Sequence, residues 1–291
     1  MKGLKVKEKN SKVFSTTSLL ILSFYTLILF FPLFWVTMTS FKSAYEFSIN
    51  KIGLPEQLNF KNYINAINLY IPIGRRKIYM EEMLFNSLLF CALYSVVPIY
   101  ASTTVAYACA RYPSAYGKVL LNAVVFFMVF PVIGGLSGSM DLAIKIGTYD
   151  NIWRSILLQF NFGGASFLVY YGAFKGVPRD YSEAAQLDGA GHFRIMFCII
   201  IPMIAPIIKA YFITTLVGLW NDWTTALTWF PSSPTIAYGL YRFSSGATGN
   251  TAANEATQCA TCVISAIPMV IFFAIFKKQI IGKVAIGGLK G

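Results

Sequence analysis

The sequence predicts an all-α protein that crosses a membrane several times, and three observations lead to this prediction. Hydrophobic residues make up 56% of the 291 residues and charged residues only 12%, whereas a soluble domain has about 25% charged residues. The charged residues are separated by long stretches that carry no charge. Finally, Lys and Arg gather between alternate stretches, which is typical of loops on the cytoplasmic side of a membrane.

Five charge-free stretches are long enough for a helix that crosses the hydrocarbon core, which takes about 20 residues. A sixth is interrupted by Lys209 near its start and by Asp222 near its end. We therefore predict six transmembrane helices within a single domain of residues 1–291. Their expected ranges are 15–40, 84–110, 119–138, 153–174, 203–229 and 257–277. The first helix is expected to be a retained anchor, because no small-residue cleavage site follows it.

The positions of Lys and Arg predict that both termini are cytoplasmic. With the N-terminus inside, the cytoplasmic segments are 1–14, 111–118, 175–202 and 278–291, and bases clearly exceed acids in them. The outer segments hold both signs. The main exception is the cluster Arg75-Arg76-Lys77, which falls in the longest outer loop, where the rule is weaker.

Several functional classes find no support in the sequence. It contains no G-x-x-x-x-G-K-[ST] phosphate loop, so we expect this chain to bind no cofactor and to hydrolyse no ATP itself. His192 is the only histidine, and neither a catalytic set nor a metal-ligand set can be built around it. The net charge of +12 lies in short pieces between apolar spans, which argues against binding of nucleic acid.

Cys259 and Cys262 form a C-x-x-C pattern at the outer start of the last helix. Without a soluble βαβ context, we interpret them as small packing residues one helical turn apart. The alternative is a redox pair. Pro98 and Pro268 lie inside predicted helices and indicate either kinks or tolerated irregularities of packing.

The candidate functional segment is "YSEAAQLDGAGHFRIMFCIIIPMIAPIIKA", residues 181–210. Asp180 precedes Glu183 by three residues, which is the spacing of a capping box. Asp188-Gly189 resembles a helix end, since glycine tolerates the left-handed conformation found there. These signals predict a helix of about two turns, from Tyr181 to Leu187.

A helix of two turns is too short to be stable alone in water, so this one must dock on something. Its alanines and glycines allow another backbone to approach closely. We therefore expect the cytoplasmic loop 175–202 to contact a protein partner, and the alternative is a loop that lies along the lipid headgroups. Gly189 would be required either by a positive φ or by a close approach of the partner.

The ordered pattern E-A-A, two residues, D-G-A and I-x-x-P-x-x-x-P, from Glu183 to Pro206, resembles the cytoplasmic EAA loop of ABC importer permeases. Other stretches resemble the second permease subunit of maltose-type carbohydrate importers: "NSLLF", "AYACARYP", "IGTYDNIW" and the tail "IIGKVAIGGLKG". Gly191 stands where that family usually has Ser, and Met196 where Phe is common. The outer loop 41–83 matches weakly, so it implies nothing about the substrate.

The resemblance implies a type I ABC importer permease fold in the cytoplasmic membrane of a bacterium, with the short helix as a coupling helix in a cleft of an ATPase. The implied partners are a second permease chain in a heterodimer, two cytoplasmic ATPase subunits that bind ATP and Mg, and an extracellular solute-binding protein. The implied substrate is a carbohydrate, and membrane lipid surrounds the helices. The C-terminal tail would reach the ATPase dimer. The implied coupling residues are Glu183, Ala184, Ala185, Asp188, Gly189 and Ala190.

A second candidate segment is Trp220-Asn221-Asp222-Trp223. An ionisable residue within a membrane is a functional candidate by default, and sugars are suited to aromatic faces, amides and carboxylates. These four residues could therefore line the substrate path. They could equally form an aromatic belt, because Asp222 lies about 24 Å along the helix from Pro206, near the outer headgroups where Trp is enriched.

Two other classes of membrane protein fit less well. A secondary transporter or channel would be expected to show paired charges within its spans, or inverted repeats. The spans contain only Lys209 and Asp222, and we find no repeat. A membrane-embedded enzyme would need a catalytic constellation, and the sequence offers none.

Overall fold

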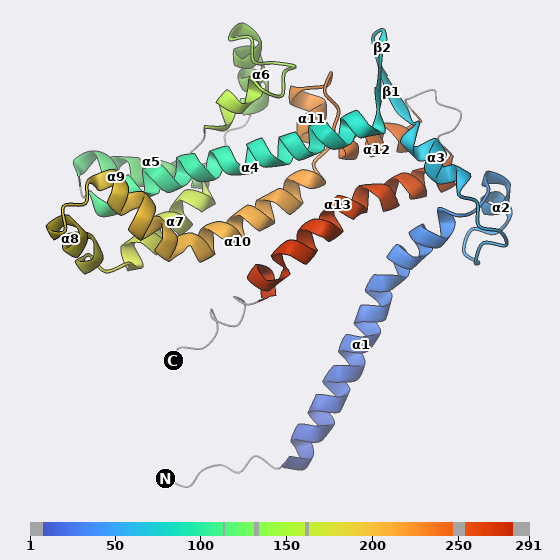
Figure 1. The fold of residues 1–291 in the computed structure, drawn as a ribbon, viewed down its shortest axis with the longest axis horizontal. Coiled ribbons are helices and arrows are strands. Elements are labelled where there is room, and N and C mark those ends of the chain that lie inside the picture. The colour runs from blue at the N-terminus through green and yellow to red at the C-terminus, as the bar shows by residue number, and fades with distance from the viewer. Residues whose placement is uncertain (1–7, 113, 131–133, 161–162, 247–253, 282–291) are drawn as a thin grey trace. The chain divides into compact units, whose positions relative to one another are not determined.

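The computed structural model describes residues 8–112, 114–130, 134–160, 163–246 and 254–281, and these are mostly helical (Figure 1). The chain divides into two compact units. The first contains residues 1–69 and 246–266, and the second contains residues 70–245 and 267–291. The single domain expected from the sequence stays a prediction.

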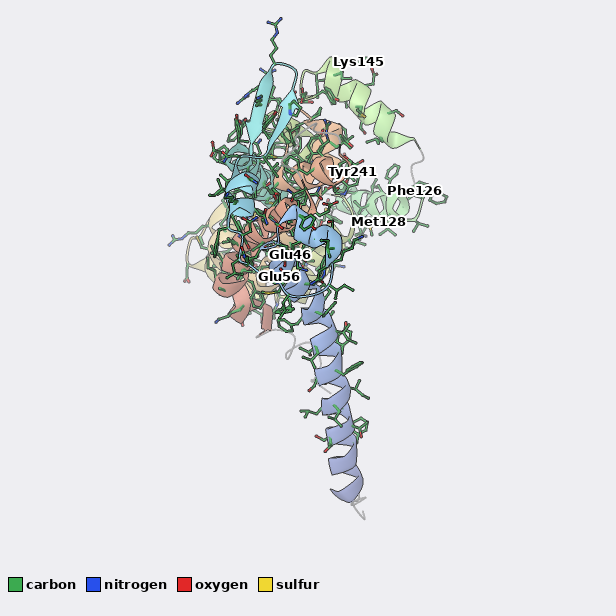
Figure 2. The ribbon with its side chains drawn as sticks, turned by 90° about the vertical axis from the view of Figure 1, so that its right-hand side faces the viewer. Glu46, Glu56, Phe126, Met128, Lys145 and Tyr241 are labelled. Atoms are coloured by element: carbon green, nitrogen blue, oxygen red, sulfur yellow. The ribbon has the colours of Figure 1, made fainter. Side chains whose placement is uncertain are left out.

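The first unit contains α1 (Glu8–Thr39), α2 (Ala44–Ile49), α3 (Lys61–Ile67) and the first part of α13 (Glu255–Ile281). A polar network orders the segment that follows α1. The buried Lys42 donates from Nζ to the Asn50 carbonyl oxygen at 2.7 Å, and Asn62 Nδ2 donates to the Lys42 carbonyl oxygen at 2.7 Å. Beyond α1, the Glu56 backbone N–H donates to Glu46 Oε1 at 2.7 Å (Figure 2).

The second unit begins with the strands β1 (Tyr70–Ile73) and β2 (Arg76–Tyr79). Its helices are α4 (Met80–Arg111), α5 (Ala115–Val129), α6 (Gly135–Lys145), the 3₁₀ helix η1 (Ser155–Gln159), α7 (Ala165–Gly176), α8 (Asp180–Leu187), α9 (His192–Ile195), the π-helical turn η2 (Met196–Ile200), α10 (Ile201–Trp220), α11 (Thr224–Trp229), α12 (Ile236–Ser244) and the end of α13. Along α4, the elements α8 and α9 lie at the end opposite the β1–β2 hairpin (Figure 1).

The hairpin departs from the expected all-α fold. The two strands are antiparallel, and Tyr70 pairs with Tyr79 and Ile71 with Ile78. Ile71 and Ile78 are buried, while Pro72 and Lys77 beside them are exposed. This alternation favours a strand, because successive side chains of a strand point to opposite faces. The hairpin lies within the expected outer loop 41–83, for which the sequence predicted no strand.

Four of the six expected spans are confirmed as helices long and apolar enough to cross a membrane. Within the described residues these are Phe14–Thr39, Met80–Arg111, His192–Trp220 and Glu255–Lys277. The helix α5 is apolar but has only 15 residues, fewer than the roughly 20 that a straight crossing takes. The total of six spans therefore stays a prediction, because two of the expected spans are not confirmed.

The expected ranges 119–138 and 153–174 are wrong as single helices, and the range 203–229 is confirmed only up to Trp220. The first is divided into α5 and α6, and Pro131 follows α5, consistent with helices ending before a proline; Pro131 itself lies outside the described residues. The second contains η1 and α7, and Gly164 has φ +93° at the start of α7, which ordinary residues rarely adopt. The third ends as a helix at Trp220, and α11 follows after a turn.

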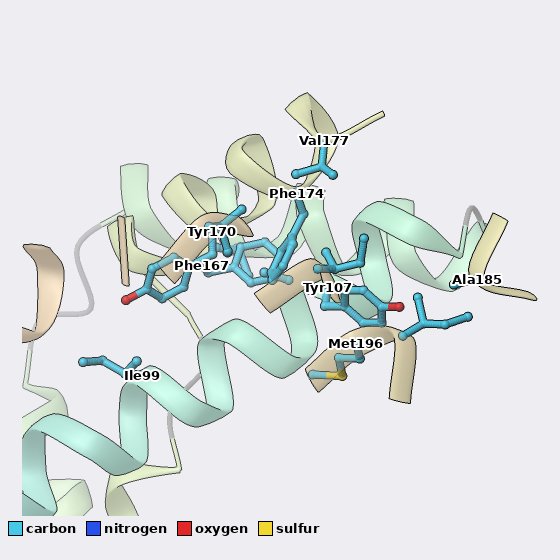
Figure 3. Packing of buried hydrophobic residues seen from close by; sticks show 13 residues of the cluster. Ile99, Tyr107, Phe167, Tyr170, Phe174, Val177, Ala185 and Met196 are labelled. Carbon is cyan, nitrogen blue, oxygen red and sulfur yellow. The ribbon is translucent and has the colours of Figure 1, made fainter. Parts of the chain in front are cut away.

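A hydrophobic cluster joins α4, α7, α8 and the helical run from α9 to α10. Tyr107 of α4 meets Phe174 of α7 edge to face, with ring centroids 5.4 Å apart. Figure 3 shows Tyr107, Met196 and Ala185 towards one end of the cluster and Ile99 towards the other. The short helix α8 is therefore packed onto the long apolar helices.

Candidate functional site

The helix α8 begins one residue earlier than expected, and the predicted capping box is wrong. Arg179 is the N-cap residue and makes no side-chain capping bond, while the Glu183 N–H donates to the Arg179 carbonyl oxygen at 3.1 Å. Asp180 is already helical, so it occupies the first turn instead of the cap. A carboxylate there is still favourable, because the N-terminus of a helix carries partial positive charge.

The end of α8 is a Schellman motif, as the predicted stop at Asp188-Gly189 implied. The Ala190 N–H donates to the Ala185 carbonyl oxygen at 2.9 Å, and the Gly189 N–H donates to the Gln186 carbonyl oxygen at 3.0 Å. Gly189 has φ +78°, and no atom of the described chain lies within 4 Å of the place where its Cβ would be. Backbone conformation therefore explains the glycine, and no close approach within the chain is needed.

The predicted coupling residues lie on different sides of α8. Ala185 is only 8% exposed and belongs to the hydrophobic cluster, so it holds the helix in place and offers no contact surface. Ala190 is half-buried. The others are exposed: Glu183, Ala184, Asp188 and Gly189.

Two large apolar side chains that the sequence analysis did not select stand out on this segment. Leu187 is 90% exposed and Phe193 is 80% exposed, and Tyr181 is also exposed. Isolated exposed apolar residues are common on protein surfaces, but here they flank a helix that has too few turns to stand alone. The sequence signal that could have identified them is the presence of Leu and Phe in a segment otherwise rich in Ala, Gly and acids.

The segment after α8 continues without interruption into a membrane-length helix. The helix α9, the π-helical turn η2 and α10 form one helical run over residues 192–220. Pro202 lies directly after the π-helical turn, as the second residue of α10. Near the start of the run, Tyr112 Oη and His192 Nδ1 are hydrogen-bonded at 2.8 Å.

The second candidate segment forms the turn between α10 and α11. Trp220 is buried, and Trp223 stacks on Tyr241 of α12 with ring centroids 3.9 Å apart and planes inclined by 10°. The exposed Asn221 donates from Nδ2 to the Val217 carbonyl oxygen at 3.0 Å. These side chains support the local fold, and whether they meet a substrate stays a prediction.

Asp222 has a clear local role in this turn. Its Oδ1 accepts hydrogen bonds from the Thr225 N–H at 3.0 Å and from Thr224 Oγ1 at 2.7 Å, at the first turn of α11. Asp222 lies beyond the end of the membrane-length helix. Burial alone would raise the pKa of its carboxyl, but the hydrogen bonds from Thr225 and Thr224 bring the pKa below its ordinary value. The carboxylate is therefore ionised at neutral pH.

The chain is similar in sequence to permease proteins of other bacteria. SmoH of Agrobacterium fabrum, a sulfoquinovosyl glycerol transport system permease protein, is 26% identical over 267 residues, which are 90% of this chain and 89% of SmoH. NgcG of Streptomyces coelicolor, a diacetylchitobiose uptake system permease protein, is 24% identical over 280 residues, covering 94% of this chain and 88% of NgcG.

In fold, the chain is similar to a crystal structure of a bacterial ABC transporter involved in the import of the acidic polysaccharide alginate. The TM-score is 0.75 at 18% identity, over 95% of this chain and 99% of the other. A family model described as a binding-protein-dependent transport system inner membrane component matches residues 82–285. Because this match spans well over half of the sequence, the chain belongs to that family of ABC importer membrane permeases.

Proposed function

We propose that this protein is a permease subunit of an ATP-driven importer and carries a sugar or oligosaccharide across a bacterial membrane. Relatives of nearly the same length are named as permeases for sulfoquinovosyl glycerol and diacetylchitobiose, which supports a carbohydrate substrate. A second permease would complete the path. An extracellular binding protein would deliver the substrate, as in the alginate transporter solved with a saccharide-bound periplasmic protein.

The observation that carries the proposal is the exposed outer side of α8. Its packed side is fixed by Ala185, while Leu187 and the nearby Phe193 present large apolar surfaces. Such side chains are natural anchors for a pocket on a partner, because a few buried apolar or aromatic residues supply most of the binding energy of an interface. We propose that an ATPase subunit, which binds ATP and Mg, accepts them and pushes α8 when it closes.

This role of α8 is tested by Leu187→Glu, which places a charge where an apolar anchor would be buried. We expect the variant to be made and inserted normally but to co-purify with much less ATPase, at least tenfold below the wild type, because burying an unpaired charge is costly. Tyr116→Glu is the matched control, since Tyr116 is 87% exposed at the start of α5 and lies away from α8 in the sequence. Equal ATPase recovery in the two variants would remove the basis for docking through α8.

We also propose that Asn221 and Asp222 lie beside the substrate path, held in place by Trp220 and by the stack of Trp223 on Tyr241. The support is chemical: an exposed amide and an ionised carboxylate between aromatic rings suit the hydroxyl groups of a sugar. Asp222 also stabilises the turn before α11. Two substitutions in the Discussion separate this structural role from the proposed contact with substrate.

A further inference from the structure

A cavity of about 160 Å³ lies between the end of α4 and one side of α8. From α4 and the residue after it come Tyr107, Arg111 and Tyr112, and Ile195 of α9 closes another side. The contribution of α8 and its N-cap is polar: Arg179, Ser182, Glu183 and Gln186. These four recur at helical spacing and therefore share one face of α8, whereas Leu187 is exposed beside it and does not line the cavity.

Arg111 presents two unused donors within this part of the structure. Its Nε and Nη2 atoms are buried and have no hydrogen-bond partner among the described residues. These two nitrogens form one edge of the planar guanidinium, and their parallel N–H groups fit two oxygens of a carboxylate or phosphate. Ser182 Oγ is likewise buried without a partner in the described chain. Buried donors in native proteins are nearly always paired, so an acceptor is to be expected here.

The charge around the cavity favours an anion. Arg111 and Arg179 both line it and repel each other, while Glu183 supplies a single negative charge. Within the described side chains Glu183 pairs with neither arginine, since the ion pairs found there join Arg76 with Glu82 and Lys145 with Asp141. One carboxylate against two guanidinium groups leaves a formal charge of +1. A bound oxyanion would relieve the repulsion and supply the missing acceptors.

The position of the cavity indicates where such an anion comes from. Arg111 is the last residue of the membrane-length helix Met80–Arg111, so a crossing by this helix would bring the cavity near the phospholipid headgroups. Arginine is well suited to phosphate because its fork of donors matches phosphate oxygens. One water molecule takes about 30 Å³ of the liquid, so the cavity has room for a phosphate group.

We propose that this cavity binds a phosphate group, held by Nε and Nη2 of Arg111 and assisted by Arg179 and by Ser182 Oγ. The headgroup of an anionic phospholipid is the source that the position favours, and free phosphate has the same chemistry. A lipid held there would bridge the end of α4 and the face of α8 that lines the cavity. The site is independent of the proposed transport function, because it rests on the cavity alone.

The test measures binding of phosphatidylglycerol to the purified full-length chain by native mass spectrometry after delipidation. We expect the wild type to retain one phosphatidylglycerol, and Arg111→Lys to bind it roughly tenfold more weakly, because lysine keeps the charge but loses the paired donors. Arg194→Lys is the matched control, since Arg194 is exposed on α9 and does not line the cavity. Ser182→Ala gives a second, milder variant if Arg111→Lys folds poorly, and its affinity should fall as well.

Adding millimolar inorganic phosphate distinguishes the two sources. Displacement of the lipid by phosphate would mean that the site accepts the free ion, and resistance would mean that it recognises the headgroup in its lipid; either result supports a phosphate site. The proposal is overturned if wild type and Arg111→Lys bind phosphatidylglycerol and phosphate equally. It is also overturned if the wild type binds neither and Arg111→Lys instead loses the ATPase, since Arg111 would then meet a carboxylate of the partner.

Discussion

At the scale of single residues, Gly189 is the position where the structure answers most directly a question that the sequence left open. The sequence left open whether a positive φ or a crowded partner required glycine. The φ of +78° and the two hydrogen bonds of the Schellman motif assign the requirement to the backbone. Gly191, two residues later, has φ −70° and ψ 161°, a conformation that any residue adopts.

We predict that Gly189→Ala loosens the end of α8 while Gly191→Ala does not. A left-handed conformation costs an ordinary residue about 1–2 kcal/mol, which corresponds to about a 5- to 30-fold larger open population. Amide hydrogen exchange across residues 180–188 should be faster by such a factor in Gly189→Ala alone. Neither glycine has a described atom within 4 Å of its Cβ position, so crowding within this chain cannot account for a difference. Equal exchange in the two variants would contradict the assignment to the backbone.

At the scale of elements, the long apolar helices were predictable and the interrupted ones were not. The helices α1, α4 and α13 follow from charge-free stretches, because length and apolarity suffice to predict a span. The break before α7 depends on the backbone of Gly164, and a glycine inside an apolar stretch does not by itself indicate a break. The short β1–β2 hairpin depends on which isoleucines are buried, which only the assembled chain decides.

The candidate site was predictable in its position but not in its orientation. The spacing of Asp180 and Glu183 and the stop at Asp188-Gly189 predicted a short helix with a glycine end, and both the helix and its end are present although the capping box is not. Which face of α8 points outwards is set by packing against α9 and η2, and the short pattern of α8 does not reveal which side they cover. For this reason Ala185, expected at the interface, is buried, and Leu187 was overlooked.

Asp222 links the element α11 to the proposed substrate path, and two substitutions separate these roles. Asn offers an oxygen that accepts a hydrogen bond at a helix start nearly as well as Asp, whereas Ala offers none and costs about 1 kcal/mol. We expect Asp222→Ala to lower the yield of folded protein. Asp222→Asn should be made in normal amounts but take up sugar more slowly in cells, because the charge beside the path is gone. Normal uptake by Asp222→Asn would leave Asp222 with its structural role only.

At the scale of the whole molecule, the proposed coupling role requires α8 to face the cytoplasm, where ATP is available. The structure connects α8 to membrane-length helices through the hydrophobic cluster and through the unbroken run from α9 to α10. The prediction that α8 is cytoplasmic rests on the Lys and Arg pattern alone. The C-terminal tail, expected to reach the ATPase, lies outside the described residues, so the orientation is best tested elsewhere.

We predict that Ile52 is outside the cell and Tyr116 inside. Both side chains are largely exposed, at 78% and 87%, so a cysteine at either position should be open to a reagent on its own side. In a background without the five native cysteines, a membrane-impermeant maleimide should label Ile52→Cys in intact cells and leave Tyr116→Cys unlabelled. After permeabilisation both should be labelled, which controls for reactivity. Labelling of Tyr116→Cys alone in intact cells would invert the topology and place α8 on the side without ATP, where it could not serve as a coupling helix.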